Sequence, residues 1–301
     1  MYKHLLVPLD GSKLAEAALP PAAFLSEKLC ASVTLIHVVE KNPPTEIHGE
    51  HHLANQEEAC DYLNQIAKET FSPEVKVECH VHTEEVSDVA RSIVDHTGEF
   101  SPDLIVMCTH GSGGLHDLMV GSIAQQVIGY GTTPILLIQP RERGERHFTP
   151  IQRILVPLDT DPIHNHGLND ADKLAIELDA SLHLMHVVPT LGTLSGRRAA
   201  TGRMLPVATS AMLDMTEEAA HTYLDDLADT WRDEGLTVTT EVWRGDPPQQ
   251  IMHAARRSRI DLIVLGTHGK SGMQAFWAGS VAVKVTKQSE IPILLVPVGK
   301  E

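Results

Sequence analysis

Short apolar runs alternate with longer amphipathic stretches along the first half of the chain. The short runs are rich in Val, Ile and Leu and mostly lack alternating polar residues, which is typical of strands buried on both faces. They predict five strands, at Leu5–Leu9, Ser32–Val38, Lys76–His82, Leu104–Met107 and Ile135–Ile138. The stretches between them predict four helices, at Lys13–Lys28, Gln56–Thr70, Val86–His96 and Ser122–Ile128. This alternation indicates an α/β fold with a five-stranded parallel sheet and right-handed crossovers.

The same pattern returns in the second half of the chain. LLVPLD at 5–10 returns as ILVPLD at 154–159, LIHVV at 35–39 returns as LMHVV at 184–188, and the DLIV-xx-THG block at 103–111 returns at 261–269. We therefore expect two domains, at 1–142 and 150–301, joined by a charged linker. The second copy is nine residues longer between its second and third blocks, and the Gly-, Ser-, Thr- and Arg-rich segment Pro189–Pro206 is interpreted as a loop.

Composition excludes several classes of function. The 301-residue chain carries a formal net charge of -16 and has no long apolar run, so neither nucleic-acid binding nor membrane insertion is expected. Its first residues read as a strand rather than a secretory signal. The four cysteines contain no CxxC pair, which favours reduced thiols and a cytoplasmic location.

The third repeated block ends in a glycine pattern suited to a phosphate. In the second copy Gly266, Gly269 and Gly279-Ser280 follow the spacing G-x2-G-x9-G-[ST]. Glycines directly after a strand let a phosphate approach the backbone, and the N–H groups at the start of the next helix favour an anion. The alternative is an ordinary strand–turn–helix with Ser280 as its cap. Because the block occurs at the same place in both copies, ligand binding is the favoured interpretation.

The order and duplication of these blocks resemble the universal stress protein family along nearly the whole chain. The matching pieces are the LLVPLDGS and ILVPLDTD starts, the HVV runs, the DLIVxxTHG blocks, the GSxA helix starts and the final TPILLI and IPILLV runs. The resemblance implies two Rossmann-like domains of the adenine nucleotide alpha hydrolase-like type. It also implies an intramolecular pseudo-dimer, in which the last strands, Pro134–Ile138 and Pro292–Val296, pair antiparallel. Many members of the family bind ATP through the G-x2-G-x9-G-[ST] spacing, and others bind no nucleotide.

The resemblance implies one ligand site in each copy. ATP or another adenine nucleotide is the implied ligand. Asp161 adds a carboxylate to the second copy, which would either repel a triphosphate or help to hold Mg²⁺. In the second copy the implied residues are Pro157 and Leu265 lining the adenine pocket, Asp159 and Val187 at the adenine or ribose, and Gly266, Gly269, Gly279, Ser280 and Val281 around the phosphates. The matching residues of the first copy are Pro8, Asp10, Val38, Met107, Gly111, Gly121, Ser122 and Ile123.

The two copies depart from this pattern at different places. Cys108 stands at the first glycine position of copy one, where a side chain needs room and disfavours a positive φ. After the third strand, copy one reads His82-Thr83-Glu84-Glu85, whereas copy two reads Arg244-Gly245-Asp246-Pro247. Copy two has its own departure, because Thr160-Asp161 replaces the Gly-Ser that follows Asp10. On balance we expect the second copy to bind the nucleotide more strongly.

Histidines form a second candidate constellation. His48, His51 and His52 lie in one polar segment, and His80 and His82 share one face of a strand. Together they are candidate zinc ligands, since neutral imidazole is a common ligand, although scattered surface histidines are the favoured interpretation.

Three further residues invite a catalytic interpretation. His110 and His268 occupy the same loop position in the two copies, where a general base is one interpretation and loop-orienting hydrogen bonds are the favoured one. Cys108 is either a redox thiol of lowered pKa or, as favoured, an inert and partly buried one. Neither copy contains a Walker loop or an organised set of nucleophile, base and oxyanion donors.

The expected function is therefore stress response through binding or signalling with an adenine nucleotide, rather than dedicated catalysis. One alternative is a slow ATPase or other nucleotide-processing enzyme, whose turnover would be lost in Asp159→Ala. The other is an adaptor that holds an apolar or lipid-like ligand, with 189–206 as a lid. Association of two chains into a homodimer is a further expectation.

Overall fold

The computed structural model describes residues 1–41, 46–47, 50–51, 53, 55–109, 122–140, 148–159, 168–268 and 281–298. A two-stranded antiparallel sheet pairs β3 (Glu46–Ile47) with β4 (Glu50–His51). All other strands belong to one sheet: β1 (His4–Pro8), β2 (Ser32–Glu40), β5 (Val77–Val86), β6 (Leu104–Cys108), β7 (Ile135–Ile138), β8 (Arg153–Leu158), β9 (Ser181–Val188), β10 (Val238–Arg244), β11 (Leu262–His268) and β12 (Ile293–Val298).

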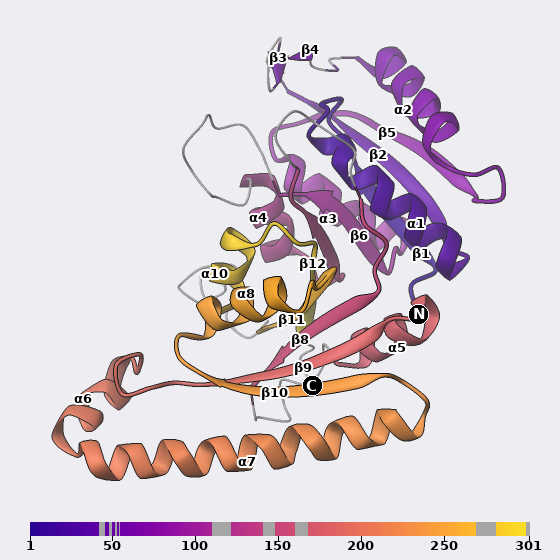
Figure 1. Ribbon diagram of the computed structural model, residues 1–301. Helices are drawn as coiled ribbons and strands as arrows, with labels where there is room; N and C mark the ends of the chain where they lie inside the picture. Colours follow the sequence, from indigo (N-terminus) through magenta and orange to yellow (C-terminus); the bar gives the residue numbers. More distant parts are fainter. Residues whose placement is uncertain are drawn as a thin grey trace.

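This sheet has ten strands in the order β10-β9-β8-β11-β12-β7-β6-β1-β2-β5 (Figure 1). Within each half every described strand pairing is parallel, as predicted. The halves join where β7 and β12 pair antiparallel, with Leu136 opposite Leu294 at the centre of the register. The expected pseudo-dimer is therefore confirmed, and its physical reason is that each apolar edge strand covers the other.

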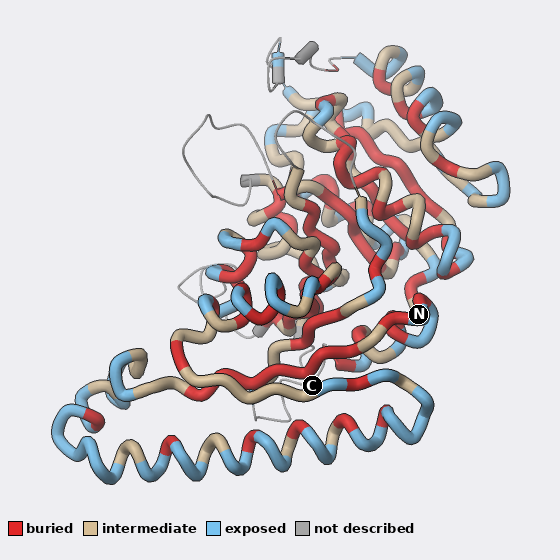
Figure 2. The backbone as a smooth tube through the Cα atoms, viewed as in Figure 1, coloured by how far each residue is buried: buried red, intermediate tan, exposed pale blue. Residues whose placement is uncertain are grey.

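Helices cover both faces of this sheet. The helical segments are η1 (Ala15–Ala18, a 3-10 turn), α1 (Leu19–Leu29), α2 (Gln56–Thr70), α3 (Val89–Phe100), α4 (Ser122–Tyr130), α5 (Leu168–Leu178), α6 (Gly196–Met204), α7 (Pro206–Asp233), α8 (Pro247–Arg257) and α10 (Val281–Gln288). One apolar core packs α1, α2, α5 and α7 on one face, and the other packs α3, α4, α8 and α10 on the opposite face. Each core runs through both domains, and Figure 2 shows the buried strands between the helical layers. No helix among the described residues has the length and apolar character needed to cross a bilayer.

The predicted boundaries agree best where a cap or turn is local. Gln56–Thr70 and Ile135–Ile138 are observed with the predicted bounds. The predicted helix Lys13–Lys28 instead divides into η1 and α1. The division occurs because Pro20 and Pro21 lie in the first turn of α1, where their missing N–H groups cannot continue the hydrogen bonds of a preceding helix.

The loop interpretation of Pro189–Pro206 is wrong, because this segment contains α6. Ser195 stands at the N-cap, and the Arg-Arg-Ala-Ala run at 197–200 consists of good helix formers. Gly202 is buried, and a Cβ built on it would lie 3.2 Å from Leu194 Cδ1. Glycine therefore permits close packing of α6 on the preceding turn, and the Gly and Ser content does not mark a loop. Pro206 begins α7, at a position where its missing N–H costs nothing.

Candidate functional site

The apolar residues predicted for the site lie at the carboxyl ends of neighbouring strands. In the first domain Val38 and Met107 are buried in the same core, on the α3 and α4 face. In the second domain Val187 and Leu265 take the equivalent places on the α8 and α10 face. The two prolines complete the match, because Pro8 is in register with Ile36 and Pro157 with Met185, which are the same positions of β2 and β9. Both halves therefore present the same apolar strand ends.

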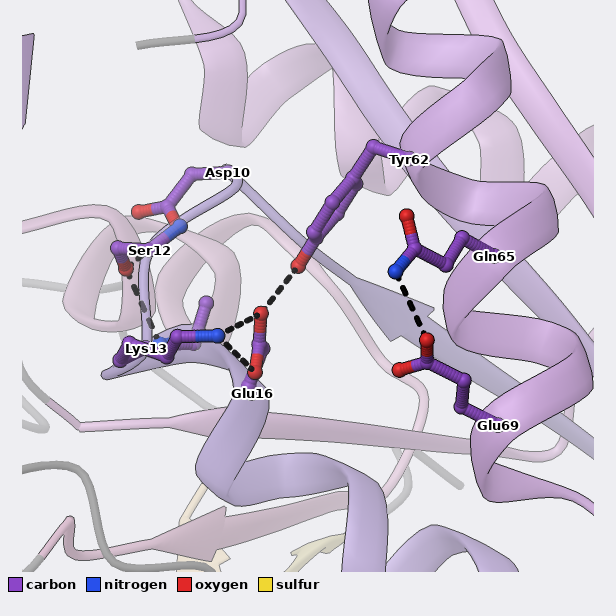
Figure 3. Close-up of polar contacts among 8 residues, drawn as sticks. Asp10, Ser12, Lys13, Glu16, Tyr62, Gln65 and Glu69 are labelled. Atoms are coloured by element: carbon purple, nitrogen blue, oxygen red, sulfur yellow. Dashed lines mark hydrogen bonds and ion pairs between the residues drawn. The ribbon is translucent and has the colours of Figure 1, made fainter. Parts of the chain in front are cut away.

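An aspartate follows the first strand of each domain. Asp10 Oδ1 accepts hydrogen bonds from the backbone N–H of Ser12 (2.9 Å) and from its hydroxyl (2.7 Å), so the carboxylate closes its own turn (Figure 3). Gly11, between them, has φ +89°, a conformation that favours glycine. Asp159, the equivalent residue, is exposed. Thr160 and Asp161 lie outside the described residues.

A buried acidic residue organises the turn beyond Asp10. The Lys13 ammonium lies 3.3 Å from a carboxylate oxygen of Glu16, whose side chain is 2% exposed, and Tyr62 donates its hydroxyl to the same carboxylate at 3.4 Å (Figure 3). Lys13 is thereby held by a local ion pair. It is a poor candidate for the phosphate lysine of a Walker-type loop, because its charge is already compensated.

Two buried histidines, which were not among the predicted site residues, hold the chain at the end of the first strand of each domain. His37 Nδ1 donates to the Leu9 carbonyl at 2.8 Å, and His186 Nδ1 donates to the Leu158 carbonyl at 2.8 Å. Each bond fixes the residue directly before the site aspartate. The signal was available, because the histidine recurs in the HVV block of both copies, but the sequence does not say which carbonyl it meets.

Cys108 and Gly266 occupy equivalent positions, but the positive φ expected at this position is not observed. Cys108 is in register with Ile138 and Gly266 with Val296, so both lie inside parallel strands, and neither has a positive φ. The remaining difference is one of space. The Cys108 residue keeps some exposed surface, but its thiol turns inward and donates to the Leu14 carbonyl at 2.7 Å. Copy two has no side chain at this position.

Burial, with the Asp10 carboxylate as a smaller contribution, raises the pKa of the Cys108 thiol well above its usual range. A raised pKa opposes thiolate formation, which argues against the redox interpretation of this residue. We expect Cys108 to be alkylated by iodoacetamide at pH 8 at least about tenfold more slowly than the exposed Cys30 of the same chain. Peptide mass spectrometry over a time course measures both rates. Equal rates would contradict the expectation.

The prediction that the third strand of copy one ends at His82 is also wrong. Thr83, Glu84 and Glu85 lie inside β5, where the register against β2 shifts so that these three residues pass a single residue of β2. The strand continues because Val86 still pairs with Glu40, and its carbonyl accepts from the Lys41 N–H at 2.9 Å. The true exit is at Asp88, which caps α3 as Asp246 stands at the N-cap of α8.

The glycine-rich loops fall largely outside the described residues. This applies to Gly111, Gly121, Gly269, Gly279, Ser280 and His110. On either side of these residues the structure describes β6 and β11 before them, and α4 and α10 after them, beginning at Ser122 and Val281. Ile123 packs against the core of the α3 and α4 face. Of His268 only the backbone, at the end of β11, is described.

The structure describes the side chains of only two of the five candidate zinc ligands, His80 and His82. His48 and His52 lie outside the described residues, and His51 is described only as part of the backbone of β4. His80 and His82 do share a face of β5, and they meet His96 of α3, which the sequence analysis did not include. Burial and the neighbouring His96 lower the pKa of His80.

The protein is therefore a tandem α/β protein. Its two Rossmann-like domains share one sheet and repeat one set of residues at their strand ends. The family model of the Universal stress protein family matches residues 1–139 and 150–297. The chain therefore belongs to the universal stress protein family and contains two copies of its domain.

Individual relatives match either nearly the whole chain or about half of it. A universal stress protein of Mycolicibacterium smegmatis is 24% identical over 308 residues, covering 97% of this chain and 96% of that protein. One of Methanocaldococcus jannaschii is 28% identical over 145 residues, covering 48% of this chain and 81% of that protein. The crystal structure of a universal stress protein from Archaeoglobus fulgidus superposes with a TM-score of 0.69 at 16% identity, covering 98% of this chain and 96% of that one. This last likeness shows the fold.

Proposed function

We propose that the chain binds an adenine nucleotide, ATP or a close relative, at the carboxyl ends of its strands. The observation that carries the proposal is the repetition of one constellation in both domains: a strand-end aspartate, apolar strand ends beside it and a buried histidine that holds the preceding carbonyl. Ligands of open parallel sheets bind at this edge. Apolar strand ends suit a flat base, and an aspartate suits ribose hydroxyls.

We further propose that the chain acts in the stress response by binding or signalling, with the second domain as the stronger site. The asymmetry rests on space beside the aspartate. In the first domain the Cys108 thiol lies near Asp10, close enough for that carboxylate to influence the pKa of the thiol. In the second domain Gly266 has no side chain at the same register position, so a phosphate can approach the backbone there.

Exchanging the two residues tests the asymmetry. We expect two unequal ATP affinities in the unaltered chain, with Gly266→Cys weakening the tighter site by about tenfold, ~1.4 kcal/mol, because a thiol then stands beside Asp159. Cys108→Gly should strengthen the weaker site. Isothermal titration with Mg²⁺–ATP measures both affinities.

A matched pair of aspartate variants assigns each affinity to its domain. Asp159→Asn should remove the tighter binding, and Asp10→Asn should remove the weaker. Two equal affinities in the unaltered chain, or an exchange without effect, would contradict the asymmetry. No heat and no bound nucleotide in mass spectra of the denatured protein would contradict nucleotide binding itself.

A further inference from the structure

Three imidazoles converge between the edge strand of the first domain and the helix that covers it. His80 and His82 are two residues apart on β5 and so point to the same face, where His96 of α3 meets both rings at centroid distances of 4.9 Å. The Nε2 atoms of His80 and His96 are 3.1 Å apart, and one nitrogen of each of the three rings lies within 4.8 Å of the others. Two imidazoles bound to one tetrahedral zinc ion have their nitrogens about 3.3 Å apart, given bonds of roughly 2.05 Å.

The third ring is already oriented for ligation. His96 is buried, and its Nδ1 donates to the Ser92 carbonyl at 2.7 Å. Because a carbonyl only accepts, the proton is fixed on Nδ1, and the Nε2 lone pair is left facing His80 Nε2 at 3.1 Å. A backbone carbonyl that holds the outer nitrogen of a histidine is the usual support of a metal ligand.

The surroundings of the rings suit a partly enclosed metal ion. Phe100 stacks on His96 at 5.6 Å and meets His80 edge-on at 4.9 Å, which gives the cluster an apolar wall. Glu99 Oε2 lies 3.8 Å from His96 Nε2 on a side chain that is 62% exposed, so this carboxylate can turn toward the ion as a fourth ligand. His80 and His82 are only partly buried, which leaves a path from solvent.

The second domain indicates that the fold itself does not require this cluster. By register against the matching strands, Glu241 and Trp243 of β10 take the places of His80 and His82. Counted from the N-cap aspartates Asp88 and Asp246, Ala254 takes the place of His96. There the strand face is packed differently, with Arg257 over the Trp243 ring at 5.4 Å.

We propose that His80, His82 and His96 bind a divalent transition-metal ion, with Zn²⁺ as the best match. Three imidazole nitrogens and one carboxylate are a ligand set that Zn²⁺ accepts, whereas Mg²⁺ and Ca²⁺ prefer oxygen ligands. The site lies on the outer strand of the first domain and needs no nucleotide.

Titration of the chelator-treated full chain with ZnCl₂ tests the site. We expect one Zn²⁺ per chain by calorimetry and a rise in the melting temperature. His96→Gln and His80→Ala should each weaken binding by more than about 100-fold, since each removes a direct ligand. His253→Ala removes a histidine that packs on Trp243 in the second domain, and it should bind Zn²⁺ as the unaltered chain does.

Two further measurements test whether cysteines, rather than the three histidines, bind the ion. CoCl₂ should give visible bands without the near-ultraviolet thiolate band that a cysteine ligand produces. Cys79 directly precedes His80 in β5, and Cys60 lies in α2. The double variant Cys60→Ala/Cys79→Ala should bind Zn²⁺ as the unaltered chain does. Circular dichroism checks that His96→Gln folds. If it does not, His80→Ala on the partly exposed strand carries the test. Unchanged affinity in a folded histidine variant, loss of binding in the cysteine variant, or no binding by the unaltered chain would overturn the proposal.

Discussion

Leu294→Ala is expected to destabilise the protein by about 3 kcal/mol, because it empties a fully buried site at the junction of the two domains. Leu294 is 1% exposed and lies opposite Leu136 in the only antiparallel pairing of the ten-stranded sheet that the structure describes. Both leucines belong to the core on the α1, α2, α5 and α7 face, which runs through both domains. Equilibrium unfolding in guanidinium chloride measures the loss. Met215→Ala is the matched control, because Met215 is 72% exposed and should change stability by less than about 0.5 kcal/mol.

A double-mutant cycle separates the cross-domain contact from cavity formation alone. The losses in Leu136→Ala and Leu294→Ala should not add, because the two side chains are neighbours, and a coupling energy of about 0.5–3 kcal/mol is expected. Additive losses would show that the two leucines do not contact each other, which would contradict the pairing of β7 with β12.

Gly245→Ala carries the second large expected effect, a loss of about 2 kcal/mol. Gly245 has φ +143°, which side chains rarely adopt, and a Cβ there would lie 3.0 Å from Gln250 Cγ and 2.6 Å from its Nε2. The residue also holds the turn between β10 and α8: its N–H donates to the Val188 carbonyl (3.0 Å), and its own carbonyl accepts from the Thr193 hydroxyl (3.1 Å). Thermal unfolding measures the loss.

The same substitution at Gly98 should have the opposite sign. Gly98 lies in α3, and a Cβ there would meet nothing within 4 Å. Alanine restricts the unfolded chain and favours the helix, so Gly98→Ala should stabilise the protein by about 0.5–1 kcal/mol. Destabilisation of both variants by similar amounts would refute the conformational argument.

Local patterns predicted most of the strands and helices of the first domain, and repetition predicted the second. They failed where packing against another segment determines the local structure. Pro189–Pro206 has the composition of a loop, but Gly202 packs against Leu194 and helix α6 forms. Thr83–Glu85 lies beyond the predicted end of the third strand, but an irregular register keeps it in β5. Composition reports neither contact, because both depend on a neighbouring segment.

In the candidate site, too, some features were predictable from the sequence and others depended on contacts between segments. Strand order and chain repetition brought the predicted apolar strand ends together, since the carboxyl ends of parallel strands share one edge of a sheet. Four side chains escaped prediction or were misjudged. His37 and His186 hold the carbonyls of Leu9 and Leu158, and His96 meets two histidines of β5 from a helix. For Cys108 the expected role of a positive φ was wrong, and the expected need for room remains as its difference from Gly266.

The sequence by itself determined the duplication, the α/β class and the strand edge at which the candidate site lies. Those features follow from local periodicity and from the order of blocks along the chain, which need no knowledge of contacts. The tertiary structure alone decided which side chains meet, above all the three imidazoles of the first domain. The physical reason is that a strand register and the rotation of a helix on a sheet are set by packing between segments far apart in the chain, as His80 and His96 illustrate.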